Sequence, residues 1–175
     1  MLEWRSAMNL LIVDDEYLVV EEVVTVTDWE LLGITEIYSA TNAVSAVRIL
    51  NEKKIDIMIC DIEMPQTDGL ELSKKAKENF PDLEIVMLTS HAEFNYVRNA
   101  LRYGCYDYLL KPVMEDDIIK VMKNLVTKIE RERHQAQLQE EGIVWNQLKP
   151  VWKEKYWEEM LRGLRDDPNR ECEEY

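Results

Sequence analysis

The chain has 175 residues, of which 46% are hydrophobic and 32% are charged. This length and composition fit one soluble globular domain with an extension, and they exclude a disordered or fibrous chain. The formal net charge of −14 repels phosphate backbones, so these residues do not suit direct binding to nucleic acid.

Short apolar segments alternate with amphipathic ones along most of the sequence. The apolar segments, typical of strands buried in a parallel sheet, are Asn9–Val13, Ile34–Ala40, the run from Ile55 to Asp61, Glu84–Leu88 and Tyr106–Leu110. The segments predicted as helices are Tyr17–Val26, Ala43–Leu50, Leu70–Asn79, Phe94–Tyr103 and a stretch from Met114 onward. This alternation predicts an α/β domain, a doubly wound five-stranded parallel sheet with helices on both faces.

Local signals mark the ends of some predicted helices. Thr41-Asn42 is a capping signal for the helix Ala43–Leu50. Gly104 is expected to end the helix Phe94–Tyr103. Within Ala43–Leu50 the apolar residues Val44, Val47 and Leu50 share one stripe. A loop containing Pro65 and Gly69 is expected after Asp61.

The composition changes near Arg131, so we expect one domain over residues 8–131 and a helical linker or extension over residues 132–175. A heptad-like seam runs along the helix that leaves the domain, formed by Ile118, Met122, Leu125 and Ile129. A second short helix is expected over Pro150–Gly163, and its apolar face has no partner in the chain. We interpret that face as packing on an absent domain or on a second copy.

The cysteines and the apolar runs indicate the compartment. The three cysteines, Cys60, Cys105 and Cys172, lack C-x-x-C spacing, and two of them lie in strand-like runs where a reduced core thiol is expected. No apolar run approaches the length of a transmembrane helix, and residues 1–16 have no proper signal peptide. We therefore expect a cytoplasmic protein without membrane contact.

Polar side chains follow four of the predicted strands. They are Asp14 and Asp15, Asp61, Thr89, and Lys111. Because the carboxyl ends of parallel strands meet at one edge of a sheet, we expect these side chains in one cleft. Three carboxylates favour a hard divalent cation such as Mg²⁺, and a hydroxyl with an ammonium suits a phosphoryl group. The predicted chemistry is nucleophilic attack by one Asp on phosphorus, although Asp61 alone is equally well explained as a turn former.

At these residues the sequence resembles the receiver domain of two-component response regulators. The matching segments are Leu11–Glu16, Asp61–Gly69, Thr89–His91 and Asp107–Pro112. The resemblance implies a flavodoxin-like (CheY-like) (βα)5 fold in which a sensor histidine kinase phosphorylates Asp61, and Thr89 and Lys111 contact the transferred group. The implied Mg²⁺ ligands are Asp14, Asp15, Asp61 and the backbone carbonyl of Glu63.

The same resemblance implies further roles. Tyr108 occupies the position of a rotamer switch coupled to Thr89, with an ordinary strand aromatic as the alternative. Glu63 and His91 occupy positions that tune dephosphorylation, although for His91 a solvated loop residue is the favoured interpretation. The Lys111–Pro112 bond is expected to be cis.

Asp28–Ile34, Ser90–Val97 and Asp107–Pro112 look like the YesN-type regulators, in which a helical linker and an AraC-type DNA-binding domain follow the receiver. We expect control of transcription, with DNA contacted only through a C-terminal domain absent from this chain. Phosphorylation is expected to favour a homodimer through the face Phe94–Leu125 or through the helix after Glu115.

Two other classes of function compete with this hypothesis. One is a stand-alone receiver or a pseudo-receiver that acts as an interaction module without DNA output. The other is a phosphatase of the haloacid-dehalogenase type, which would need its nucleophile on the first strand and an Asp where this chain has Glu63. Beyond its own phosphorylation and dephosphorylation, the chain is not expected to be an enzyme.

Overall fold

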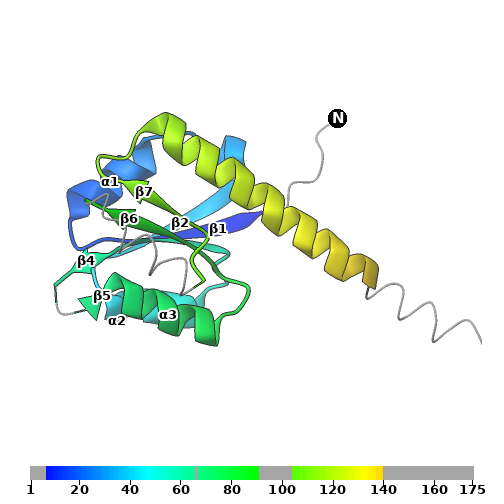
Figure 1. Cartoon of the computed structure of the whole chain (residues 1–175), viewed down its shortest axis with the longest axis horizontal. Coiled ribbons are helices and arrows are strands. Elements are labelled where there is room, and N and C mark those ends of the chain that lie inside the picture. Colours follow the sequence, from blue (N-terminus) through cyan, green and yellow to red (C-terminus); the bar gives the residue numbers. More distant parts are fainter. Residues whose placement is uncertain (1–6, 66, 91–103, 140–175) are drawn as a thin grey trace, which may run out of the picture. The chain divides into compact units, whose positions relative to one another are not determined.

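The computed structural model describes residues 7–65, 67–90 and 104–139 (Figure 1). The chain divides into two compact units, Met1–Glu130 and Arg131–Tyr175. Residues 115–139 are helical, and those up to Glu130 belong to the first unit. The predicted helices Phe94–Tyr103 and Pro150–Gly163 lie outside the described residues. Within the described ranges, no helix is both long and apolar enough to cross a membrane.

The first unit is built on a five-stranded parallel sheet, as the alternating pattern predicted. Its strands are β1 (Met8–Val13), β2 (Ile34–Ala40), β3 (Ile57–Asp61), β6 (Glu84–Thr89) and β7 (Asp107–Leu110). Their order in the sheet is β2-β1-β3-β6-β7, and every pair of neighbours is parallel. The central strand β3 is buried along its whole length, which explains its nearly continuous apolar sequence.

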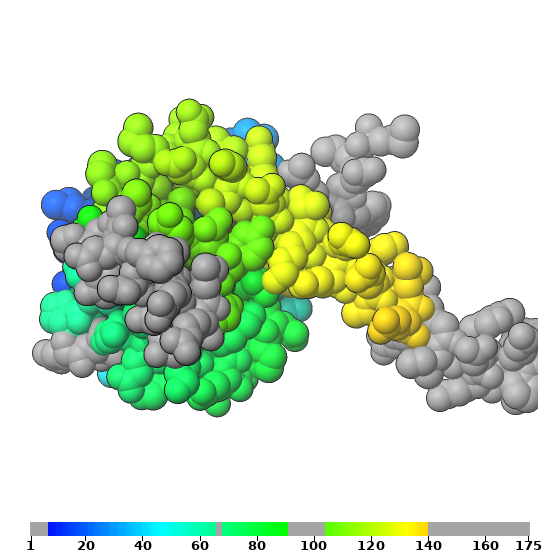
Figure 2. All heavy atoms as spheres, viewed as in Figure 1, coloured from blue at the N-terminus to red at the C-terminus, as the bar shows by residue number. Residues whose placement is uncertain are grey.

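Helices cover both faces of the sheet. They are α1 (Tyr17–Thr25), α2 (Ala43–Glu52) and α3 (Gly69–Asn79), together with the 3₁₀ helix η1 (Glu30–Leu32) and residues 115–130. In Figure 1, α2 and α3 lie below the sheet, whereas α1 and the helix that starts at residue 115 lie above it. On the face drawn in Figure 2, the atoms of α3 (green) adjoin those of residues 104–130 (yellow-green).

The sheet separates two hydrophobic cores, because successive strand residues point to opposite faces. Ile57 and Ile59 of β3 join a core that includes residues of α1 and of the helix from residue 115. Met58 and Cys60, between and after them, join a second core with residues of α2 and α3. Each fully buried aliphatic side chain contributes about 1.5–3 kcal/mol, so both helical layers are held mainly by this burial.

The heptad-like seam packs inside the first unit. Its four members, Ile118, Met122, Leu125 and Ile129, are at most 6% exposed and belong to the first core. The seam is therefore the face that docks the helix on the sheet, and it is not available to a coiled-coil partner.

The expected apolar stripe of α2 is confirmed only in part. Leu50 is buried, but Val44 is 81% exposed and Val47 is 43% exposed, and Ala46 is buried in addition to Leu50. The expected N-cap is confirmed, because the Asn42 side chain accepts a hydrogen bond from the backbone N–H of Ser45. Ala46 and Leu50 belong to the core that α2 forms with the strands, and this packing decides the buried face.

Two short segments after β3 were not predicted. β4 (Glu63–Met64) and β5 (Thr67–Asp68) pair as a small antiparallel hairpin where the sequence indicated only a loop. The hairpin ends at Asp68, whose side chain caps α3 by accepting from the N–H of Leu70. This arrangement connects the end of β3 directly to the start of α3.

Candidate functional site

Three carboxylates converge at the carboxyl edge of the sheet. Asp61 ends β3, and Asp14 follows β1 immediately, beside Asp61 because Val13 pairs with Cys60 in register. Asp14 is fully buried and Asp61 is 3% exposed, whereas Asp15 is exposed. One carboxylate oxygen from each of the three residues lies within 4.8 Å of the others. The sequence had predicted this convergence.

Backbone contacts hold Asp14 in position. Its N–H donates to the carbonyl oxygen of Ala40 at 3.1 Å, which ties the end of β1 to the end of β2. Its Oδ1 atom accepts a hydrogen bond of 2.9 Å from the N–H of Glu16. The other oxygen, Oδ2, is directed toward Lys111.

Lys111 pairs with two of the three acids. Its Nζ atom lies 2.6 Å from Asp14 Oδ2 and 3.0 Å from Asp61 Oδ1. Its backbone N–H donates to the carbonyl oxygen of Thr89 at 2.9 Å, so the ends of β6 and β7 are joined beside the acids. Thr89 is buried. The expected cis bond between Lys111 and Pro112 is confirmed.

Burial and charge change the acidity of this cluster in opposing ways. Burial is the largest influence on Asp61 and raises its pKa, the charges of Asp14 and Asp15 add to the rise, and Lys111 opposes it. For Lys111, burial acts to lower the pKa, but the hydrogen bonds and charges of Asp14 and Asp61 outweigh it and the pKa is raised. The lysine therefore stays protonated between two carboxylates.

The cluster fits a hard divalent cation. Its three carboxylates offer only oxygen ligands, and one ammonium group leaves an excess of negative charge. Oxygen ligands that include more than one carboxylate, with room for water and a phosphoryl oxygen, suit Mg²⁺. Within the described ranges, no other group of three His, Cys, Asp or Glu residues converges in this way.

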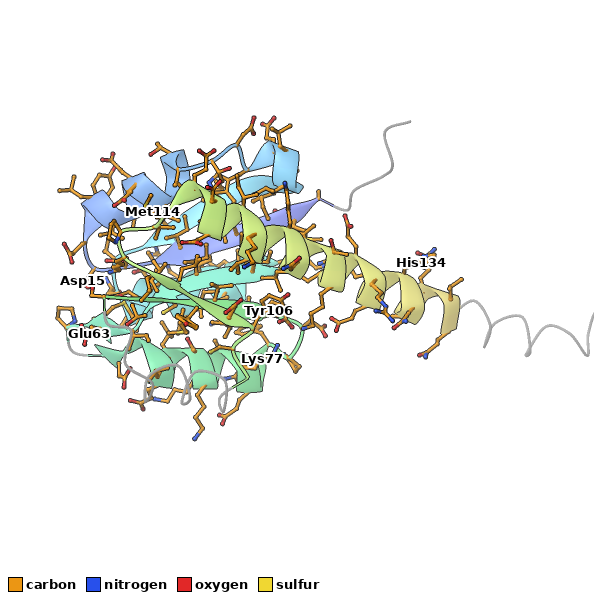
Figure 3. All side chains as sticks on the ribbon, turned by 45° about the horizontal axis from the view of Figure 1, so that its top comes forward. Asp15, Glu63, Lys77, Tyr106, Met114 and His134 are labelled. Carbon is orange, nitrogen blue, oxygen red and sulfur yellow. The ribbon has the colours of Figure 1, made fainter. Side chains whose placement is uncertain are left out.

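The remaining predicted residues lie around this edge or outside the described ranges. Tyr108 pairs with Met87 in register, is partly buried, and packs against the core formed with α2 and α3. Glu63 is exposed on β4, and Figure 3 shows it at the same end of the sheet as Asp15. His91 lies outside the described residues.

Sequence reasoning missed a second charged cluster at the opposite end of the sheet. It surrounds Glu84, the first residue of β6, which is only 7% exposed. The signal was available, because an acid at the start of a buried apolar strand is rarely left without a basic partner. Its partners are two lysines on other elements, Lys77 and Lys128, which contact Glu84 in the fold.

A parallel sheet in this strand order, with acids after two neighbouring strands and a lysine after a third, defines a receiver-type α/β domain. The sequence profile of the response regulator receiver domain matches residues 10–123, and the chain belongs to that family. The resemblance in the strand-end motifs is thereby confirmed. Receiver domains are signalling modules and generally are not classical enzymes.

Individual relatives agree with this assignment. The chain is 34% identical over 124 residues to YesN of Bacillus subtilis, described as an uncharacterized transcriptional regulatory protein, covering 71% of this chain and 34% of YesN. Over 127 residues it is 32% identical to the response regulator SaeR of Staphylococcus aureus, covering 73% of this chain and 54% of SaeR. The chain therefore spans between a third and about half of these relatives.

A solved structure shows the same fold. The REC domain of AraT, a response regulator from Geobacillus stearothermophilus, superimposes with a TM-score of 0.68 at 30% sequence identity. The match covers 73% of this chain and 98% of that one, so the likeness extends over the whole receiver domain of AraT.

Proposed function

We propose that Asp61 accepts a phosphoryl group from a sensor histidine kinase in the presence of Mg²⁺. The observation that carries this proposal is the position of Lys111 Nζ, 2.6 Å from Asp14 and 3.0 Å from Asp61, beside the exposed Asp15. One lysine and three carboxylates at a single sheet edge are the groups that phosphoryl transfer to a carboxylate requires.

In this reaction a carboxylate oxygen of Asp61 attacks phosphorus and a P–O bond forms. The P–N bond to the histidine of the kinase breaks, and its electron pair returns to the imidazole, which takes up a proton from water. Lys111 offsets charge on the transferred group, and the hydroxyl of Thr89 donates a hydrogen bond to it. The proposed Mg²⁺ ligands are Asp14, Asp15, Asp61 and the backbone carbonyl of Glu63, and the cation would neutralise the phosphoryl oxygens.

The regulatory part of the proposal concerns the rest of the chain. Thr89 and Tyr108 act as the switch that reports the modification, and Glu63 and His91 tune the rate of dephosphorylation. Residues 8–131 form the receiver and residues 132–175 a helical linker toward a DNA-binding output, in a cytoplasmic protein that dimerises when phosphorylated. The description of YesN as a transcriptional regulatory protein supports this output.

Intact-mass spectrometry tests the proposal directly. Incubation with acetyl phosphate and Mg²⁺ should add one phosphoryl group of about 80 Da, absent in Asp61→Asn and in the presence of a chelator. Asp82→Asn, an exposed acid away from the site, is the matched control and should be modified like the wild type. Absence of any adduct with acetyl phosphate or with a phosphorylated kinase would favour the pseudo-receiver. Steady turnover of a phosphomonoester would favour the phosphatase.

A further inference from the structure

Two lysines from different helices converge on one carboxylate oxygen at the amino end of β6. Glu84 Oε1 lies 3.1 Å from Lys77 Nζ and 2.9 Å from Lys128 Nζ. The side chain of Glu84 is 9% exposed, whereas the side chains of Lys77 and Lys128 are 25% and 37% exposed. A carboxylate this buried needs its cationic partners, since an uncompensated buried charge is strongly destabilising.

Further contacts hold each lysine in place. Lys77, in the last turn of α3, also donates a hydrogen bond of 2.7 Å to the carbonyl oxygen of Leu83. Lys128 Nζ lies 5.5 Å from the centre of the Tyr106 ring, a distance at which a cation is attracted to an aromatic face. Tyr106 is attached to the sheet through its N–H, which donates to Ile85 at 2.7 Å. Contacts other than the pair with Glu84 therefore help to position each of the two lysines.

The cluster connects two layers that the sheet otherwise separates. Apolar residues of α3 belong to one core, and those of residues 118–129 belong to the other. Lys77 reaches Glu84 from α3, and Lys128 reaches it from the helix on the other face, shortly before the first unit ends at Glu130. Figure 3 shows Lys77 and Tyr106 near each other, at the end of the sheet away from Asp15.

The opposite end of α3 touches the candidate phosphoacceptor. The helix begins at Gly69, whose N–H donates to the carbonyl oxygen of Ile62 at 2.9 Å. A Cβ atom on Gly69 would lie 1.8 Å from the carbonyl oxygen of Asp61, so the two backbones are in direct contact. A helix moves largely as a rigid element, and α3 therefore links Asp61 at one end to Lys77 at the other.

We propose that Glu84 couples α3 to the end of the helix formed by residues 115–130, so that a shift of α3 at Asp61 changes how firmly residues 124–130 are held. The use of this coupling in signalling rests on the proposed phosphorylation of Asp61. The connection is separate from the switch proposed for Thr89 and Tyr108, because it runs through the opposite end of the sheet.

Hydrogen exchange of the whole, untreated chain tests the coupling. Glu84→Gln keeps the shape of the side chain and removes its charge, and Lys128→Met leaves the pair between Lys77 and Glu84 intact. Both should accelerate exchange of the amides of residues 124–130 by about tenfold, the effect of losing one hydrogen bond to a charged group. Lys75→Met is the control, because its partner Glu71 is on the same helix and both side chains are more than half exposed.

Two results would overturn the coupling in the untreated protein. One is exchange in both variants within about twofold of the wild type, and the other is an equal acceleration in Lys75→Met. Circular dichroism identifies a variant that fails to fold, and in that case Lys128→Met decides the outcome, since it leaves Glu84 paired with Lys77.

A second arm compares the chain with and without beryllofluoride and Mg²⁺. In the wild type, beryllofluoride and Mg²⁺ should change the hydrogen-exchange rate of the amides of residues 124–130. In Glu84→Gln and in Lys77→Met this change should be at least twofold smaller. An equal response in all three proteins would overturn the route from Asp61. Failure of acetyl phosphate to modify Asp61 contradicts the proposed function instead, and the coupling is then decided by the untreated protein alone.

Discussion

A side chain on Gly69 would place its Cβ atom 1.8 Å from the backbone carbonyl oxygen of Asp61. The carbonyl carbon of Asp61 would lie at 2.8 Å, so the obstruction is backbone and no side-chain rotation relieves it. The first residue of α3 and the last residue of β3 are therefore packed against each other. Only glycine permits this approach without moving the carboxylate that we propose as the phosphoacceptor.

Gly69→Ala should lower the free energy of unfolding by about 2 kcal/mol, as expected for forced overpacking. It should also weaken Mg²⁺ binding, because Asp61 must move. Gly104→Ala is the control: its φ of +79° costs about 1 kcal/mol, but its Cβ would meet only the Lys77 side chain at 3.8 Å. Urea denaturation and Mg²⁺ titration of both variants provide the measurement. Equal Mg²⁺ affinity in the two variants would contradict the proposed contact effect.

Lys111→Met should destabilise the chain when Mg²⁺ is removed by a chelator. The substitution leaves Asp14 and Asp61 without their shared cation, and the loss should be about 2 kcal/mol, below the range for a fully buried pair because Lys111 is 13% exposed. Excess Mg²⁺ should restore most of this loss, since the cation takes over neutralisation of the carboxylates. Thermal unfolding with and without Mg²⁺ measures both effects. A deficit that Mg²⁺ does not reduce would argue against a cation site here.

Asp15→Asn separates cation binding from folding. Asp15 is exposed, so the free energy of unfolding without metal should change by less than about 0.5 kcal/mol. Loss of one of three converging carboxylates should weaken Mg²⁺ binding about tenfold or more. Calorimetric titration beside Asp82→Asn checks this expectation, and unchanged affinity in Asp15→Asn would exclude the residue as a ligand.

The two described cysteines should react slowly with iodoacetamide at pH 8. Burial is the main cause that raises the pKa of Cys105 to about 11, and burial also raises the pKa of Cys60. At pH 8 about 0.1% of Cys105 would be thiolate, the reactive form, and that fraction grows as the pH approaches 11. Peptide mapping after alkylation should show little label on either residue until urea is added. Rapid labelling of Cys60 in the folded chain would mean that β3 is accessible.

The main features of the site were predictable because they depend on order along the chain. Asp61 and Thr89 end apolar strands, and Asp14 and Lys111 follow strands directly, so a parallel arrangement brings all four to one edge. The bounds of β2 agree with the predicted Ile34–Ala40. The hairpin of β4 and β5 was missed because two-residue strands carry too little periodicity to identify.

The choice of buried helix face was less predictable. Val44 and Val47 are exposed on α2, while Ala46 is fully buried in the core that the helix forms with the strands. For residues 118–129 the sequence predicted the apolar seam, but it did not indicate which surface the seam packs against. The seam packs in the first core, together with residues of the strands.

By itself, the sequence determined the strands, their carboxyl-end acids and the family, because each depends on local periodicity and on short motifs. Only the tertiary structure decided that Lys77 and Lys128 meet at Glu84, and that Gly69 lies against Asp61. Contacts of this kind depend on how far each helix extends and on which side of the sheet it packs. Periodicity within one element contains no information about the distance to another, so these contacts arise only when the layers assemble.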